Sequence, residues 1–289
     1  MDNTTISTSV KTELIIPSYN RIDILLGTLR AVRTLYPDLK ICIGLQGDKP
    51  TYHDEETLQT YRYLRIVTLA EPSTTRTLNH CIQSSAADVI LILDDDAVPH
   101  FGWMESHLSA FASDPGLTYT CGREIRYRSG RAVYSDVVRI MVELISRSFL
   151  KKGITINGRI VGWTSRLGLI FGNFDQPGSC IINSPRGCNM AIRKDHFIKM
   201  GGFRDTFRGN AWGFEADFGL RMAKVDKYGL YVGDAIVIHY EVSAGGSRQA
   251  RKIQWFKDYL HNNEILISNL GIQAWFGALP RLIKKRFFT

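Results

Sequence analysis

The stretch D-V-I-L-I-L-D-D-D-A-V-P, residues 88–99, decides the fold of this 289-residue chain. Residues 89–93 form an apolar run of strand length, which is typical of a strand buried on both faces of a parallel sheet. Three adjacent carboxylates, Asp94, Asp95 and Asp96, follow this run directly. Open parallel sheets bind ligands beyond the carboxyl ends of their strands. The stretch therefore predicts a buried strand that carries acidic side chains to a binding site.

Strands and helices alternate on both sides of this stretch. Apolar runs predict further strands, and apolar residues three or four apart predict helices. The predicted strands are residues 13–17, 39–45, 63–69 and 232–239, and the predicted helices are residues 75–85 and segments that begin near residues 22, 194 and 214. Residues 123–184 show weak periodicity and are expected to face the substrate. The predicted fold class is α/β, with a mostly parallel twisted sheet flanked by helices and a helical C-terminal tail.

The composition excludes several classes of protein. With 44% hydrophobic and 22% charged residues, the chain is neither a disordered tail, nor a collagen-like fibre, nor a coiled coil. Its longest apolar runs fall far short of the roughly 18 residues that span a membrane. The N-terminal residues lack the basic opening and apolar run of a secretory signal, so we expect a cytoplasmic protein. The five cysteines form no C-x-x-C pair and are expected to be buried, reduced thiols.

Adjacent carboxylates need a positive partner. Asp94, Asp95 and Asp96 repel one another and raise one another's pKa unless a cation lies among them. Mg²⁺ and Mn²⁺ prefer oxygen ligands and share them between carboxylates and substrate phosphates. The triplet therefore predicts a divalent cation, whereas an acidic surface turn or a helix cap is the alternative interpretation.

Four ordered motifs together resemble glycosyltransferase family 2. They are P-S-Y-N-R at residues 17–21, the acidic triplet, G-C-N-M-A-I-R at residues 187–193 and G-G-F-R-D at residues 201–205. The resemblance runs from about residue 12 to about residue 248. It implies the GT-A fold and inverting transfer of a sugar from a nucleotide-sugar. On this basis residues 1–100 are the nucleotide-sugar-binding half, residues 101–248 the acceptor-binding and catalytic half, and residues 249–289 a helical, basic tail.

The resemblance also implies roles for residues of the first half. Pro17, Tyr19, Arg21 and Arg76 would help to form the nucleotide pocket. Asp94 would face the ribose or the metal, and Asp96 the metal and the diphosphate, with Asp95 as an alternative metal contact.

The chain departs from the family pattern after its second predicted strand. The family commonly has an aspartate there, which holds the uracil or the ribose. Here the strand ends in G-L-Q-G-D, so Gln46 or Asp48 would take its place. The base of the donor stays open, with a UDP-sugar as the leading candidate.

A second group of candidate catalytic residues lies in W-G-F-E-A-D, residues 212–217, at the start of a predicted helix. Inverting transfer needs a base that accepts the proton of the acceptor hydroxyl. The family places an acid here, and we expect Glu215 to be the base, with Asp217 as the alternative. Other interpretations are that Glu215 is an acid at a helix start and that Asp217 pairs with Arg221 on the helix.

His239 follows the last predicted strand and resembles the family's late histidine before a glycine segment. The resemblance implies that His239 is a metal or diphosphate ligand and that Arg248 holds the diphosphate, since a guanidinium donates two hydrogen bonds. The alternative for His239 is a polar residue with ordinary partners. Gly245 and Gly246 would let the intervening loop close over the donor.

Positive charge is concentrated near the C-terminus. The net charge is +8, and residues 245–289 contain eight basic against two acidic residues. A helical stripe of apolar residues is expected to pack on the catalytic half; it consists of Ile253, Phe256, Leu260, Ile267 and Leu270. The aromatic and basic residues 281–288 suit an anionic membrane surface at the inner face of a membrane, as a lipid-linked acceptor would require.

These observations lead to one functional prediction and two alternatives. The prediction is an inverting, metal-dependent glycosyltransferase in surface polysaccharide or lipid-linked glycan synthesis. The alternatives are a transferase that modifies protein or nucleic acid and a non-catalytic nucleotide-sugar-binding protein. Nucleic acid is disfavoured because no recognition motif accompanies the basic tail. The sequence leaves the oligomeric state open.

Overall fold

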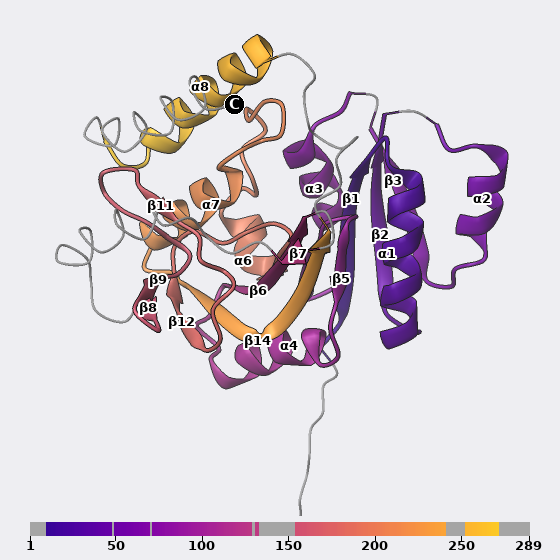
Figure 1. Ribbon diagram of the computed structural model, residues 1–289, viewed down its shortest axis with the longest axis horizontal. Coiled ribbons are helices and arrows are strands. Elements are labelled where there is room, and N and C mark those ends of the chain that lie inside the picture. Colours follow the sequence, from indigo (N-terminus) through magenta and orange to yellow (C-terminus); the bar gives the residue numbers. More distant parts are fainter. Residues whose placement is uncertain are drawn as a thin grey trace, which may run out of the picture.

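The computed structural model describes residues 10–47, 49–69, 71–128, 131–132, 154–240 and 252–271. A central mixed sheet with the strand order β12-β14-β6-β13-β4-β1-β2-β3 runs through both halves of the chain, and helices cover both of its faces (Figure 1). The predicted α/β fold is therefore confirmed. The division of donor and acceptor functions between the two halves stays a prediction.

The first half forms a parallel sheet. Its strands are β1 (Thr12–Tyr19), β2 (Lys40–Gln46), β3 (Leu64–Thr68) and β4 (Val89–Leu93). β1 lies between β2 and β4 and pairs in parallel with both, and β2 pairs in parallel with β3. All four carboxyl ends therefore meet at one edge of the sheet, as the alternation of strands and helices predicts.

The second half adds the antiparallel pairs that make the sheet mixed. Its main strands are β6 (Tyr119–Arg128), β12 (Ser179–Ile182), β13 (Asn189–Arg193) and β14 (Gly229–Tyr240), and β5 (Ala97–Pro99), at the end of the first half, joins them. β13 is antiparallel to both β4 and β6, and β5 and β12 are antiparallel to β14. β14 is parallel to β6.

Side chains that alternate along the strands build two cores on opposite faces. One core joins Leu14, Ile16 and Leu91 to α1 (Ile22–Leu35) and α4 (Trp103–Ser113). The other joins residues of the opposite face, such as Ile15 and Ile92, to three further helices. These are α3 (Thr74–Gln83), α6 (Lys194–Lys199) and α7 (Phe214–Ala223). Strands of a sheet covered on both faces must be apolar throughout, which explains the run at residues 89–93.

Two helices were not expected from the sequence. α2 (Tyr52–Gln59) has a capping box in which the Thr51 hydroxyl accepts from the Asp54 N–H and the Asp54 carboxylate accepts from the Thr51 N–H. Its only buried apolar side chain is Leu58, so the apolar periodicity is weak. α4 lies where the pattern loosens after Pro99, yet it buries Trp103 and Phe111.

Asn189 ties several elements of the second half together. Its Oδ1 accepts from Trp103 Nε1 at 2.7 Å and from His107 Nε2 at 3.0 Å. Its Nδ2 donates to the carbonyl oxygens of Arg123 at 3.0 Å and Ala235 at 2.8 Å. Asn189 is fully buried, and all of these bonds are made inside the protein. The start of β13 is therefore held rigidly against β6, β14 and α4.

The described residues between 123 and 184 form part of one long strand and several short strands. β6 continues to Arg128 and pairs with β7 (Arg131–Ala132). Two small hairpins follow, β8 (Thr155–Ile156) with β9 (Arg159–Ile160) and β10 (Trp163–Thr164) with β11 (Ile170–Phe171). The last strand of this range, β12, pairs with β14. Strands of two to four residues are too short to show a repeating pattern of apolar residues, which explains why the sequence of this region has weak periodicity.

The predicted tail contains α8 (Lys252–Ile267), which packs on α7 (Figure 1). The predicted packing face was wrong for Ile253, whose side chain is 75% exposed. Ile267 of the predicted stripe is buried, as expected. The other buried residues of α8 are Asp258, Tyr259, Asn262, Asn263 and Leu266, so polar residues share this face with apolar ones. Residues 281–288 lie outside the described residues.

Two further expectations can be compared with the structure. All five cysteines are buried and free, as expected. None of the described helices combines the length and the apolar character that crossing a membrane requires.

Candidate active site

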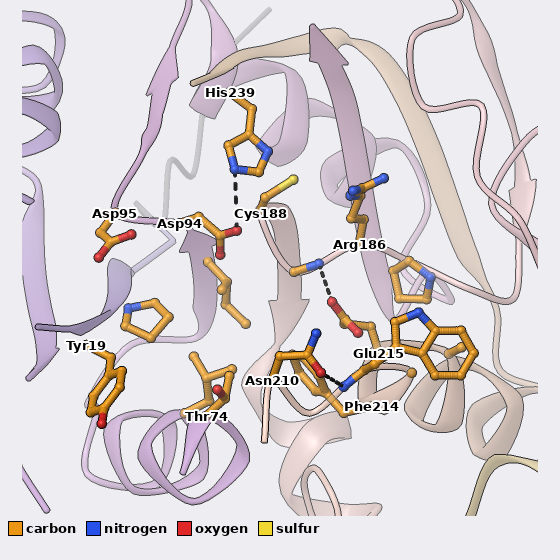
Figure 2. A pocket seen from close by; sticks show the side chains of 18 of the residues that line it. Tyr19, Thr74, Asp94, Asp95, Arg186, Cys188, Asn210, Phe214, Glu215 and His239 are labelled. Carbon is orange, nitrogen blue, oxygen red and sulfur yellow. Dashed lines mark hydrogen bonds and ion pairs between the residues drawn. The ribbon is translucent and has the colours of Figure 1, made fainter. Parts of the chain in front are cut away.

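A cavity of about 420 Å³ lies at the carboxyl ends of β1, β2 and β4. Residues of the first half line one side of it, and residues around α7 and the turn before β13 line the other (Figure 2). The lining includes Pro17, Tyr19, Arg21, Gln46, Asp94, Asp95, Arg186, Cys188, Glu215 and His239. The structure thus brings together most of the residues that the sequence singled out.

The expected nucleotide side is built by β1 and β2. Pro17, Tyr19 and Gln46 come from the ends of these strands, where Tyr19 and Gln46 are paired in the sheet. Gln46 is buried, and its Oε1 accepts from the backbone N–H of Ser73 at 2.6 Å. This bond leaves the amide N–H groups of Gln46 as donors toward a ligand.

Arg76 does not belong to this group. Its side chain is exposed and forms an ion pair with Glu71, with Nη2 and Oε2 3.2 Å apart, and it does not line the cavity. Two other expected donor-binding residues, Asp48 and Arg248, lie outside the described residues.

The three acids of the triplet point to three different surroundings. Asp94 lines the cavity, and its side chain is 39% exposed. Asp95 is fully buried: it accepts from Ser18 Oγ at 2.6 Å and from the Arg21 guanidinium. Asp96 lies between Arg21 Nη1 and His239 Nε2, each 2.9 Å from one of its oxygens. Asp94 is therefore the carboxylate of the triplet that is open to a ligand.

These surroundings set the charges of the acids. Burial raises the pKa of Asp94 to about 6, although the nearby His239 opposes this shift. For Asp96, burial acts in the same sense, but the hydrogen bond from His239 and the charge of Arg21 outweigh it and lower its pKa. Asp96 is thus held as a carboxylate by its two cationic neighbours.

His239, on β14, is held by carboxylates on both ring nitrogens. Its Nδ1 lies 2.6 Å from Glu124 Oε1, and its Nε2 lies 2.9 Å from Asp96 Oδ1 and 3.9 Å from Asp94 Oδ2. Burial opposes a charge on the ring, but the bonds to Asp96 and Glu124 outweigh it and raise the pKa of His239 well above its usual range. Glu124 also pairs with Arg186, with Oε2 and Nε 3.1 Å apart.

This arrangement fits a metal-binding histidine. A histidine that binds a metal through one nitrogen usually donates its other N–H to a carboxylate, which fixes the ring. Glu124 is such a carboxylate on Nδ1, so that Nε2 faces Asp94 and Asp96. Oxygen and imidazole donors of this kind suit Mn²⁺.

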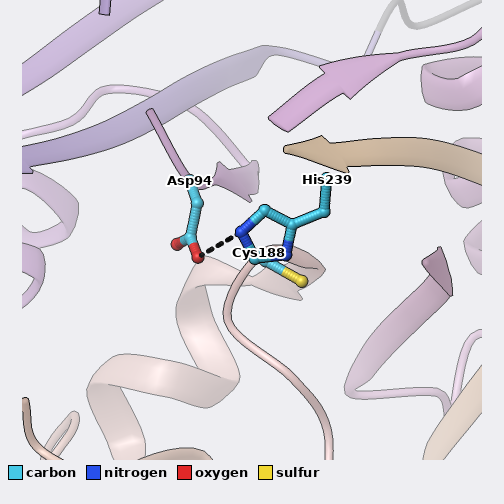
Figure 3. Close-up of side chains that lie close together, drawn as sticks. All are labelled: Asp94, Cys188 and His239. Atoms are coloured by element: carbon cyan, nitrogen blue, oxygen red, sulfur yellow. Dashed lines mark ion pairs between the residues drawn. The ribbon is translucent and has the colours of Figure 1, made fainter. Parts of the chain in front are cut away.

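Cys188 completes a cluster that the sequence analysis missed. One ligand atom each from Asp94, Cys188 and His239 lie within 4.8 Å of one another (Figure 3). Cys188 was assigned to the inert, buried thiols because it has no C-x-x-C partner in the sequence. Its position in the motif at residues 187–193 was the only available signal. Glu124 and Arg186 were missed too, because neither stands in a motif that the sequence analysis interpreted.

Glu215 faces Asp94 across the cavity from the first turn of α7 (Figure 2). The backbone N–H of Gly187 donates to Glu215 Oε1 at 3.0 Å, which orients the carboxyl. Burial raises the pKa of Glu215, and the bond from Gly187 opposes this shift only in part. A carboxylate with a raised pKa is suited to accept a proton near neutral pH.

Asp217, two residues further along α7, does not line the cavity. It is fully buried and accepts from Arg221 Nε at 2.9 Å and from Asn269 Nδ2 at 2.6 Å. Arg204 Nε lies 3.5 Å from Oδ1, the oxygen that also accepts from Asn269. The pairing of Asp217 with Arg221, one of the alternative interpretations, is therefore present, and Asp217 ties α7 to Asn269, two residues beyond the end of α8.

Comparisons with known proteins bear on the family and on the fold. The sequence profile of the family described as glycosyl transferase family 2 matches residues 13–168. Among solved structures, the chain is similar to one described as the crystal structure of GalNAc-T7 with UDP, GalNAc and Mn²⁺, with a TM-score of 0.59 and 12% sequence identity. The similarity covers 89% of this chain and 48% of that chain, so this chain spans about half of that protein's length. No curated protein matches the sequence.

Proposed function

Because the chain belongs to glycosyl transferase family 2 and has the GT-A fold, we propose that it transfers a sugar, with inversion, from a nucleotide-sugar to an acceptor hydroxyl. One observation carries this proposal. A single cavity brings Asp94 and His239, which suit a cation and a diphosphate, opposite Glu215, which suits a base. The base and the leaving group must lie on opposite sides of the sugar for a one-step inversion.

The proposed chemistry uses groups of this chain at fixed positions. Glu215, oriented by the N–H of Gly187, accepts the proton of the acceptor hydroxyl as its oxygen attacks the anomeric carbon. Arg186 lines the same cavity and is held by Glu124, so it presents a fixed positive charge near the reacting groups.

A divalent cation, Mn²⁺ or Mg²⁺, is part of the proposal. Asp94 and His239 would hold it, and Asp96 lies beside His239 on the same side. When bound, the cation neutralises the charge that develops on the leaving diphosphate. Asp96 could also bind the cation, as the resemblance implies, only if His239 released its hydrogen bond to Asp96 and bound the cation through Nε2 instead.

The donor we propose is a UDP-sugar. Tyr19 and Gln46 line the same cavity as Asp94, at the carboxyl ends of β1 and β2. Donor N–H groups of Gln46 suit the carbonyl oxygens of uracil. The similar protein GalNAc-T7 was solved with UDP and Mn²⁺, which is consistent with this choice. The acceptor we propose is a surface glycan or a lipid-linked glycan.

Thermal unfolding tests the proposal directly. A ligand present at 100 times its Kd stabilises the folded state by about 2.7 kcal/mol, so UDP with Mn²⁺ should raise the Tm more than either alone. ADP and GDP serve as comparisons for the base. Asp94→Asn should abolish the joint effect, whereas Asp23→Asn, at an exposed position on α1, should keep it. Equal shifts for wild type and Asp94→Asn, together with no release of UDP from any UDP-sugar, would contradict the proposal.

The affinity for Mn²⁺ should depend on pH through Asp94. Because burial raises the pKa of Asp94 to about 6, its carboxyl becomes protonated below this pH and competes with the cation. The plot of log Kd against pH should therefore become steeper by about one unit below pH 6. Isothermal titration between pH 5 and 7.5 measures this slope. The same plot for Asp94→Asn should lack the change.

Glu124→Gln should weaken Mn²⁺ binding by roughly 10- to 100-fold, although Glu124 does not contact the cation. Carboxylates behind a metal-binding histidine contribute about this much to affinity, because they fix the ring and its tautomer. The measurement is a titration of Mn²⁺ with circular dichroism as the check on folding. Unchanged affinity in a folded Glu124→Gln variant would show that His239 does not bind the cation.

The C-terminal residues carry a separate proposal, attachment to an anionic membrane surface. It rests on the aromatic and basic residues 281–288 of the sequence. Full-length protein should float with anionic liposomes, and a chain truncated after Leu279 should not. Neutral liposomes are the control, and equal flotation of both chains would refute attachment through these residues.

A further inference from the structure

The cluster of Asp94, Cys188 and His239 contains one group that ordinary Mg²⁺ sites lack, a thiol (Figure 3). We propose that the Cys188 sulfur is a ligand of the cation and that it makes this site prefer Mn²⁺, Co²⁺ and Zn²⁺ to Mg²⁺. The inference rests on the cation-binding part of the proposed function but not on sugar transfer.

The geometry places three different donor atoms around one point. The carboxylate, the thiol and the imidazole lie within 4.8 Å of one another. Metal–sulfur bonds of about 2.3 Å and metal–nitrogen bonds of about 2.1 Å place two tetrahedral ligands of one ion about 3.6 Å apart. Side-chain rotations that move the ligand atoms by about 1 Å therefore suffice to bring all three onto the same ion.

The backbone holds Cys188 at this point. Cys188 is buried and immediately precedes Asn189, which makes four hydrogen bonds inside the protein. His239 is fixed on the opposite side by Glu124, and Asp94 follows the end of β4. The three ligands thus come from three elements that the sheet holds together. A site on such a rigid support keeps its ligand atoms close to the positions that binding requires.

The chemistry of the ligands sets the preference. Mg²⁺ demands oxygen ligands, whereas imidazole and sulfur favour transition metals and zinc. On binding, the S–H bond of Cys188 and the Nε2–H bond of His239 would break, sulfur–metal and nitrogen–metal bonds would form, and both protons would leave to solvent. No oxidant or reductant is needed.

Cobalt gives a direct readout of this bond. Co²⁺ bound to a thiolate has a sulfur-to-metal charge-transfer band in the near ultraviolet, which oxygen and nitrogen ligands do not produce. Full-length protein is titrated with Co²⁺, with and without UDP. The band should appear in the wild type and in Cys180→Ser, a buried cysteine outside the cluster, and disappear in Cys188→Ser.

Affinities give an independent readout. Loss of a group behind a metal ligand costs roughly 10- to 100-fold in affinity, so loss of the ligand itself should weaken Cd²⁺ binding by at least about 10-fold in Cys188→Ser. The affinity for Mg²⁺ should change by less than about 2-fold. Should Cys188→Ser fail to fold, ¹¹³Cd resonances of the wild-type protein decide, because a sulfur ligand shifts them strongly downfield.

The outcomes separate this inference from the proposed function. A Co²⁺ complex of the wild type without the charge-transfer band overturns the role of Cys188 and leaves Asp94 and His239 as ligands. A ¹¹³Cd resonance typical of oxygen and nitrogen ligands alone does the same. A band that depends on Cys188, in a protein that releases no UDP, supports the inference and counts against the proposed transfer.

Discussion

Replacing Glu215 by glutamine should lower the rate of UDP release from UDP-sugars by about 10²- to 10⁴-fold, which is the usual contribution of a general base. Glutamine keeps the size of the side chain and can still accept the hydrogen bond from Gly187, but it cannot take up a proton. The loss should therefore appear in kcat, with little change in the affinity for UDP and Mn²⁺. Steady-state assays of UDP release, with water or a glycan as the acceptor, measure it.

Two controls make this result specific. Asp94→Asn should weaken the binding of the cation and UDP, an effect that Glu215→Gln does not share. The acid limb of the pH–rate profile should lie above the ordinary range of a glutamate, because burial raises the pKa of Glu215 and only its ionised form is a base. A Glu215→Gln variant that keeps a rate within about 3-fold of the wild type would exclude Glu215 as the base.

Asp217→Ala should lower the free energy of unfolding by roughly 3–5 kcal/mol, the cost of removing one partner from a buried ion pair. The change leaves the Arg221 guanidinium without its carboxylate and breaks the bond from Asn269 beyond the end of α8. Urea unfolding of the full chain measures the loss. Asp226 is not part of this cluster, so Asp226→Ala should change the free energy of unfolding far less.

The same variant separates the two candidate bases. At a temperature where Asp217→Ala is folded, it should retain most of its kcat, since Asp217 lies outside the cavity. A fully stable Asp217→Ala variant with a kcat reduced by 10²-fold or more would reverse the assignment of Glu215 and Asp217.

Most of the parallel core could be predicted from the sequence. The strand before the acidic triplet is a continuous apolar run, and α1 places its apolar residues on one face. Such patterns are local, so they can be recognised without knowing what packs against them. α2 escaped prediction because a capping box and Leu58, rather than an apolar face, mark it. The face of α8 was misjudged at Ile253 because buried asparagines replace apolar residues there.

The sequence by itself determined that acidic groups would meet at the carboxyl edge of the sheet, because the order of strand and acid is local. Only the tertiary structure decided which of them face the cavity. Asp95 turns to Arg21 and Ser18, Asp96 to His239, and Asp94 to the open space. The partners of these acids stand far away in the chain, as Cys188 and Glu124 also do. Packing between distant parts of the chain brings such groups together. Neither the spacing of residues in the sequence nor the amino-acid composition predicts that packing.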